Sequence, residues 1–246
     1  MKKFFWFIAA LVLALSCFGS SFAQAESVSK TDTDKGLKAI ESVENYISYL
    51  KNESSTDSNA IAVLDDFNNL SKDQQEKYLF ALQPENYIKI MDAVSSSNNE
   101  KTVNLDGVDI KAQLKVESTL SDITPYATYK NSHSTYSLYV LGVKTTTLSS
   151  YVTFAYSGTT ATEVTDNYGS LSNFNPAVIF TELVGKGYLE GSWAIGRASW
   201  KAYASGSLGF INDTVHLFIK ANGGSTKYYK VESTRSDWAT GGWISF

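Results

Sequence analysis

The hydrophobic period of the chain changes near Lys101, and this change constrains the fold more than any other feature of the sequence. Before Lys101, apolar residues recur at steps of three and four, which places them on one face of a helix. After it, apolar and polar residues alternate, as in a strand with one buried side. Glu, Lys and Leu also give way there to Gly, Thr, Ser, Tyr and Val. The sequence therefore predicts an α+β fold, with a helical acidic segment at 36–100 followed by an all-β domain at 101–246.

The helical segment is expected to contain three to four short helices. Apolar residues at helical spacing run through 37–50 and 61–70. Another helix is expected to begin at Ser71, because a glutamine three residues later completes a capping box. Pro84 suits the first turn of a further helix, because a main-chain N–H in that turn has no acceptor within the helix and proline lacks this N–H. Residues 26–35 lack apolar periodicity and are expected to form a flexible leader.

The all-β domain is expected to be an antiparallel sandwich or barrel. Asp106-Gly107 and Asn222-Gly223 each separate two alternating runs, which is the signal of a hairpin with a type I′ turn. Residues 136–143 are apolar on both faces and predict a central, covered strand. Several such runs joined by turn residues are typical of a sandwich or barrel. Residues 174–189 break the alternation, so we expect a long loop between two sheets or a short hidden helix.

The first 25 residues have the anatomy of a secretory signal peptide. Lys2 and Lys3 precede an apolar run from Phe4 to Leu15, and Ala23-Gln24-Ala25 offers small residues at alternate positions for a peptidase. The run is shorter than the roughly 20 apolar residues that a spanning helix needs. We therefore expect a secreted protein that is cleaved after Ala25.

A lipoprotein is the less favoured alternative for the amino terminus. Ala14-Leu15-Ser16-Cys17 resembles the lipobox of bacterial lipoproteins, in which the cysteine becomes the lipidated first residue. Lipoboxes favour leucine three residues before the cysteine, whereas this chain has alanine there and leucine one place later. Processing after Ala25 is accordingly preferred over a lipidated Cys17.

The sequence offers little material for catalysis or for metal binding. Cys17 is the only cysteine, so cleavage after Ala25 would leave no thiol for a disulfide or a metal. His133 and His216 are the only histidines and are not spaced as a metal motif. No serine stands in a nucleophile-elbow motif, and no glycine-rich phosphate loop or complete calcium loop is present. We predict no catalytic residue, no metal and no cofactor.

Charge is distributed unevenly along the chain. Residues 26–100 carry 14 acidic and 7 basic side chains, whereas residues 101–246 carry 11 and 12. Neither segment has the excess of basic residues that releases counterions from a phosphate backbone. Nucleic acid is therefore not an expected partner.

Aromatic residues supply the remaining functional signal. All four tryptophans beyond the signal peptide lie in the β domain. Aromatic faces stack on sugar rings, and tyrosine hydroxyls reach polar partners. Trp238 and Trp243 flank Thr240-Gly241-Gly242 near the end of the chain and are the candidate binding aromatics.

The leading hypothesis is a secreted, non-enzymatic binding protein whose β domain recognises cell-wall or other extracellular glycans, or a protein partner. Two alternatives stay open. Serine and threonine are dense at 134–165 and alternate in places like the strands of a membrane pore, so the second is a membrane-active protein with the helical segment as a pro-region. Membrane contact is less favoured than glycan contact. The third is an extracellular glycan hydrolase, because two carboxylates about 5–9.5 Å apart suffice for that chemistry.

Overall fold

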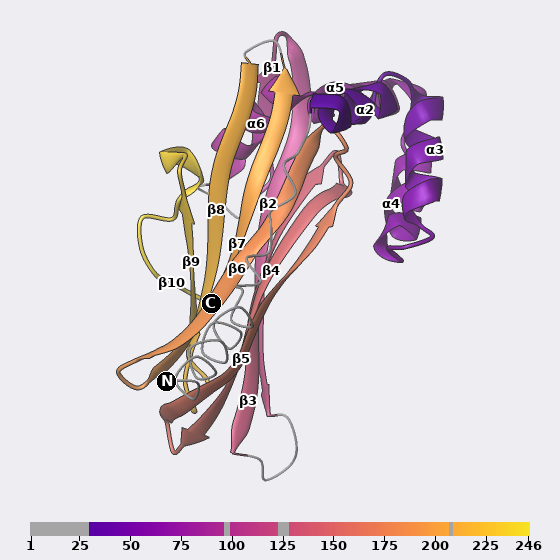
Figure 1. Cartoon of the computed structure of the whole chain (residues 1–246). Helices are drawn as coiled ribbons and strands as arrows, with labels where there is room; N and C mark the ends of the chain where they lie inside the picture. Colours follow the sequence, from indigo (N-terminus) through magenta and orange to yellow (C-terminus); the bar gives the residue numbers. More distant parts are fainter. Residues whose placement is uncertain (1–29, 96–98, 123–127, 207–208) are drawn as a thin grey trace, which may run out of the picture.

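The structure, a computed structural model, describes residues 30–95, 99–122, 128–206 and 209–246 (Figure 1). In these residues, five helices are followed by two antiparallel sheets of five strands each, which are not closed into a barrel. The expected α+β fold is confirmed, and of the two predicted architectures the structure has the sandwich and not the barrel. The expected signal peptide, with Cys17 and Ala25, lies outside the described residues.

The helices carry the terminal signals that the sequence contains. Their bounds are α2 Lys30–Ala39, α3 Val43–Glu53, α4 Asn59–Asn68, α5 Lys72–Leu82 and α6 Pro84–Val94. The capping box forms at the start of α5, where Ser71 Oγ accepts from the main-chain N–H of Gln74 and the Gln74 side chain accepts from the N–H of Ser71. Pro84 occupies the first turn of α6, as expected.

Helix α2 begins at Lys30, so residues 30–35 are helical where the sequence predicts a flexible leader. Thr33 is fully buried, and α2 packs against β6 and β7. Gly36 approaches the main chain so closely that a Cβ there would lie 1.8 Å from the carbonyl oxygen of Pro176. This packing across the fold, rather than local apolar periodicity, orders the start of the helix.

The first sheet has the strand order β1-β2-β3-β4-β5. The strands are β1 Lys101–Leu105, β2 Val108–Asp122, β3 Tyr129–Val140, β4 Val143–Ser157 and β5 Thr160–Asn173. The expected type I′ turn joins β1 and β2, with φ of 51° at Asp106 and 91° at Gly107. Leu141 and Gly142 make a similar positive-φ turn between β3 and β4, at 50° and 84°. Leucine rarely adopts that conformation, so the sequence did not signal the turn.

The second sheet has the strand order β10-β9-β8-β7-β6. Its strands are β6 Val178–Glu190, β7 Trp193–Gly206, β8 Gly209–Ala221, β9 Lys227–Ser233 and β10 Ile244–Ser245. The expected turn at Asn222-Gly223 does separate β8 from β9, but Gly223 has no positive φ. Instead, a Cβ at Gly223 would come within 2.2 Å of the Gly158 carbonyl oxygen, so this position needs glycine for space.

Most of the predicted loop at 174–189 is strand, and that prediction was wrong. Only residues 174–177 cross between the sheets, and β6 follows immediately. The pairing of β6 with β7 shifts between Leu183 and Lys186, which is a β-bulge. The bulge leaves Val184 83% exposed and interrupts the alternation that marks a regular strand.

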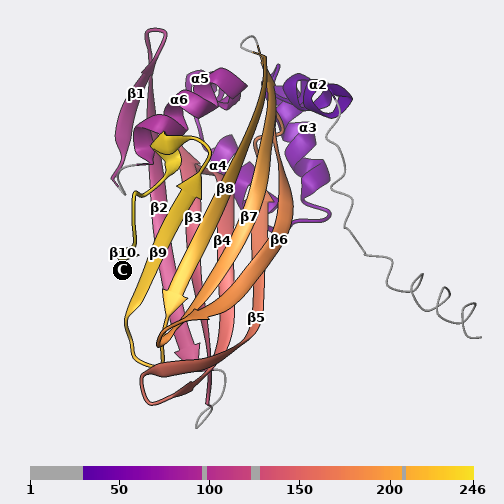
Figure 2. The same cartoon turned by 60° about the vertical axis from the view of Figure 1, so that its left-hand side comes forward.

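The helices share a hydrophobic core with most of the buried residues of both sheets. Figure 2 shows the helices gathered mainly at one end of the sheets, and their buried residues belong to this larger cluster. A smaller separate cluster between the sheets includes Val152, Phe154 and Ile219. Tyr46 Oη donates to the carbonyl of Phe174 at 2.8 Å and lies 3.1 Å from Tyr78 Oη. Asn175 donates from its side chain to the carbonyl of Leu82 at 3.0 Å. Burial raises the pKa of Tyr78 to about 12, so this hydroxyl stays protonated.

Candidate functional site

Trp238, one of the two predicted binding aromatics, lies in the core and not on the surface. It follows β9 in a short 3₁₀ turn, Ser236–Trp238, and is only 4% exposed. Its Nε1 donates to Asp92 Oδ1 in α6 at 2.6 Å. A ring in this position cannot present a face to a glycan, because its faces are covered by protein atoms.

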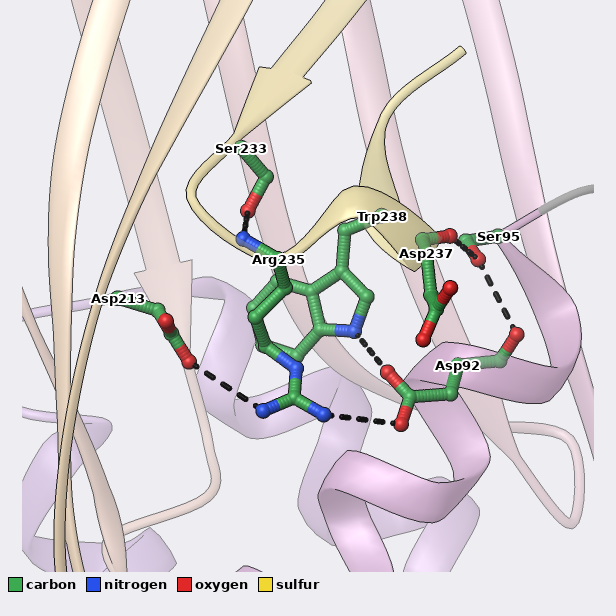
Figure 3. A network of polar contacts seen from close by, with 7 residues as sticks. All are labelled: Asp92, Ser95, Asp213, Ser233, Arg235, Asp237 and Trp238. Carbon is green, nitrogen blue, oxygen red and sulfur yellow. Dashed lines mark hydrogen bonds and ion pairs between the residues drawn. The ribbon is translucent and has the colours of Figure 1, made fainter. Parts of the chain in front are cut away.

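A polar network around Trp238 attaches the end of the chain to the helical segment (Figure 3). Asp92 Oδ2 accepts from Arg235 Nη2 at 3.1 Å, and Arg235 Nη1 lies 3.8 Å from Asp213 Oδ2. The Arg235 guanidinium also stacks on the Trp238 ring, 5.6 Å from its centroid. The carboxylates of Asp92 and Asp213 therefore both form ion pairs with Arg235, and Asp92 also accepts a hydrogen bond from the indole of Trp238. The network joins the end of the chain to α6 and β8, although Arg235 Nε and Asp213 Oδ2 are buried without a hydrogen-bond partner among the described residues.

Trp243, the other predicted aromatic, is placed at the surface by a segment that folds back along β9. The main-chain N–H of Thr240 donates to the carbonyl of Val231 at 3.0 Å, and the N–H of Val231 donates to Thr240 Oγ1 at 3.1 Å. Gly241 has a φ of 69°, which lets the chain turn after Thr240. Ile244 then pairs with Tyr229 as β10, so Trp243 lies next to the outer side of β9.

Trp243 belongs to a surface that we call the aromatic–basic face, on the outer side of the second sheet. In β7 and β8 the inner positions are buried apolar residues, and the residues that alternate with them point outward. Cross-strand pairing brings the outward residues of four strands into neighbouring rows. The face consists of the Lys, Arg, Phe, Tyr and Trp residues among them, together with Trp243: Lys186, Tyr188, Trp193, Arg197, Lys201, Tyr203, Phe218, Lys220, Tyr228, Lys230 and Trp243.

Two lysines of this face each lie beside two aromatic rings. Lys220 Nζ lies 5.4 Å from the ring centroid of Trp193 and 5.2 Å from that of Trp243. Lys230 Nζ lies 4.5 Å from the centroid of Phe218 and 5.1 Å from that of Trp243. The Trp243 ring thus lies beside two ammonium groups, and such contacts fix both the rings and the lysine chains.

The aromatic–basic face carries an excess of positive charge. Glu190 and Glu232 lie on the same side of the sheet and pair with Lys220 and Lys230 at 2.8 and 2.6 Å. The hydrogen bond from Lys220 lowers the pKa of Glu190 below its usual value. Five cations stand against two carboxylates, a local balance of +3 in a chain whose net charge is −4.

Three cations of the face have no acidic partner in the part of the chain that the structure describes. They are Lys186, Arg197 and Lys201. Arg197 Nε is buried without a hydrogen-bond partner. Lys186 and Lys201 are therefore available to an anionic ligand without first breaking an ion pair.

The two histidines lie on opposite sheets. His216 is on the outer side of β8, with Nδ1 2.7 Å from Ser199 Oγ. Burial lowers its pKa, and Arg197 adds to the effect, so the ring is neutral at pH 7. His133 is on the outer side of β3, 2.8 Å from Thr119 Oγ1. Within the described residues no three His, Cys, Asp or Glu side chains come together as a metal site.

Sequence reasoning identified Trp243 but missed its neighbours. The alternation of Phe218 and Lys220 with Leu217 and Ile219 does signal an outward position. No local pattern, however, shows that the end of the chain folds back and sets Trp243 beside Lys220. A face assembled from five separate segments depends on strand order, which periodicity does not encode.

Among the described residues, no helix is long and apolar enough to span a membrane. A scan against protein-family models and searches of curated proteins and of solved structures find no match for this chain.

Proposed function

We propose that the protein is a secreted, non-enzymatic binding protein that holds acidic extracellular glycans on the aromatic–basic face. The observation that carries this proposal is the gathering of five cations and several aromatic rings on one sheet face of an otherwise acidic chain. The secreted location rests on the signal-peptide anatomy of the first 25 residues.

The chemistry of the face matches an acidic polysaccharide. Lysine and arginine donate charge-assisted hydrogen bonds to carboxylate and sulfate groups. The rings of Trp193, Tyr228 and Trp243 offer apolar area to the C–H faces of sugar rings. A neutral polysaccharide would leave the cations unused, which is why the acidic class is favoured.

An anionic membrane is a weaker candidate for the same face. Proteins that lie in a membrane interface insert protruding apolar side chains about 5–10 Å below the headgroups. Here Phe218 is buried, and Trp193 and Trp243 are only half-exposed because lysine chains pack against them. Rings held in this way suit contact with a ligand at the surface.

Binding to polygalacturonate, compared with neutral dextran, tests the proposal. We expect the protein to bind polygalacturonate but not dextran, with an affinity that falls as salt is added. Lys186→Met/Lys201→Met should weaken binding at least tenfold, because these two lysines have no carboxylate partner among the described residues. Lys111→Met/Lys115→Met is the matched control, because Lys111 is ion-paired with Glu100 and Lys115 lies over the Tyr139 ring, both on the other sheet.

Three results would contradict the proposal. The first is no binding to polygalacturonate, and the second is equal loss in the two double variants. The third is binding to phosphatidylglycerol vesicles in place of the polysaccharide, which would assign the face to a membrane. A mass measurement on exported protein tests the location separately, with an expected start at Glu26.

A further inference from the structure

A groove of about 510 Å³ lies on the other side of the molecule, between the α3–α4 connection and the outer face of β4 and β5. Figure 1 shows α3 and α4 beside this sheet, and α4 contacts β4. The volume is in the range of about 300–1,000 Å³ that is typical of small-molecule sites. The aromatic–basic face belongs to the opposite sheet, so the two surfaces do not overlap.

The floor of the groove is formed by hydroxyl groups. Thr147 pairs with Ser172 across β4 and β5, and Ser149 pairs with Ser170 in the next row, so four hydroxyl side chains are neighbours. Thr147 Oγ1 lies 3.1 Å from Ser137 Oγ in β3. Hydroxyls both donate and accept, so the floor can pair with ligand groups of either kind.

A carboxylate on the α3–α4 connection overhangs this floor. Asp57 Oδ1 accepts from the main-chain and side-chain nitrogens of Asn59, each at 2.9 Å, and Oδ2 accepts from Ser172 Oγ at 2.6 Å. These three bonds fix the carboxylate and leave part of its capacity of about four acceptor sites unused.

The ends of the groove are a lysine and a tyrosine. Lys144 lines one end, and no carboxylate of the described residues forms an ion pair with it. Tyr151 lines the other, with its ring held between His133 at 4.9 Å and Tyr168 at 4.5 Å. Since one ammonium and one carboxylate balance each other, the lining is close to neutral, and Tyr151 is fixed before any ligand arrives.

We propose that this groove binds a neutral sugar unit. Sugar hydroxyls match the donor and acceptor sites that the floor hydroxyls keep in addition to their own bonds to Thr135, Ser137 and Asp57. An acidic sugar gains no net attraction from the lining, because Asp57 repels it while Lys144 attracts it. The site is independent of the function proposed above, because it uses another sheet and another class of ligand.

Titration of ¹⁵N-labelled protein with cellotriose, maltotriose and tri-N-acetylchitotriose tests the proposal. We expect at least one of these neutral trisaccharides to shift the amide signals of Thr147, Ser149 and Ser170. Thr147→Val/Ser170→Ala should weaken that binding at least tenfold. Thr153→Val/Ser121→Ala is the matched control on the same outer face beyond the groove, and it should bind as the unchanged protein does.

The proposal is overturned if none of the three sugars shifts these signals, if the shifts map elsewhere, or if both double variants bind equally. If the Thr147→Val/Ser170→Ala protein does not fold, the single variant Ser170→Ala is used in its place, because Ser170 is exposed. Binding of polygalacturonate to the Thr147→Val/Ser170→Ala protein is measured in parallel. Its retention with loss of the neutral sugar separates a failure of the groove from a failure of the aromatic–basic face.

Discussion

The side-chain amide of Asn167 in β5 pairs with the main chain of Arg197 in β7, across the gap between the two sheets. The N–H of Arg197 donates to Asn167 Oδ1 at 2.9 Å, and Asn167 Nδ2 donates to the carbonyl of Arg197 at 3.2 Å. Arg197 adjoins the bulge in β6, where regular pairing is interrupted. Asn167 thus takes the place of a strand neighbour and joins one sheet to the other.

Asn167→Ala is therefore expected to destabilise the fold by about 1–3 kcal/mol, because it leaves a main-chain N–H and carbonyl without partners. Asn131→Ala is the matched control, since that amide makes a single bond, to Thr153, on the outer face. Its effect should stay within about 0.5 kcal/mol. Urea unfolding measures both, and equal losses would mean that the Asn167 bridge contributes nothing special.

The two tryptophans that the sequence singled out should behave in opposite ways. Trp238→Ala removes a buried ring and leaves Asp92 without its indole donor, so a loss of about 3–5 kcal/mol is expected. Trp243→Ala removes a half-exposed ring and should cost about 1 kcal/mol while weakening polygalacturonate binding. Thermal unfolding and the binding assay together check this, and normal binding by Trp243→Ala would exclude the ring from the ligand site.

The β domain is not expected to fold without the helices. A protein of residues 101–246 would expose the core surface that Tyr46, Tyr78 and Tyr87 cover, and would lose the contact of Asp92 with Arg235. We expect no cooperative unfolding transition and weak near-ultraviolet circular dichroism. A cooperative transition, accompanied by leakage from dye-loaded vesicles, would instead support a removable pro-region.

Gly36→Ala should detach the start of the helical segment. The added Cβ would lie 1.8 Å from the Pro176 carbonyl oxygen, so either α2 or the crossing between the sheets must move. A loss of about 1–3 kcal/mol is expected from this overpacking. Gly242→Ala, where a Cβ meets nothing within 4 Å, is the control. Hydrogen exchange should show faster exchange in α2 for Gly36→Ala alone.

Stability should fall as the solution is acidified below neutrality. Burial lowers the pKa of His133 and His216, with Lys227 and Arg197 adding to it, while Glu232 opposes part of the effect at His216. The unfolded chain therefore takes up protons at a higher pH than the folded chain does. The free energy of unfolding keeps the full contribution of the two histidines above a pH of about 6.5 and loses it as the pH falls further. Unfolding at pH 7.5 and 5.5 measures the difference.

His133→Asn/His216→Asn is the variant for this pH dependence. It should unfold with more nearly equal stability at the two pH values. Glu190, whose pKa is lowered by Lys220, stays ionised throughout that range and does not mask the effect. An unchanged pH profile in the variant would assign the dependence to other groups.

The parts of the fold that were predicted are those that local physics decides. The start of α5 follows from a capping box, the start of α6 from Pro84, and the β1–β2 turn from residues that accept positive φ. The start of α2 and the strand β6 were missed for a different reason. Thr33 is ordered by burial against other elements, and the bulge after Leu183 breaks the period-2 pattern.

The candidate site was predictable only in part. Exposure of Trp243 and burial of Trp238 depend on hydrogen bonds between Thr240 and Val231 and on Asp92 in a distant helix. Two tryptophans five residues apart therefore have different environments that no local sequence pattern distinguishes. The hydroxyl groove likewise requires Asp57 to be brought over β5 by the fold.

Because acidic and basic residues lie in different parts of the molecule, an electric field exerts a torque on it and favours one orientation. The acidic helices lie mainly at one end of the sheets, whereas the cations lie on a side face. Close to a polyanion, the helical end is repelled while the aromatic–basic face is attracted, so the protein is oriented before it makes contact with the polyanion. Association should accordingly be fast at low ionic strength and slow down as salt rises, with most of the change in the association rate constant.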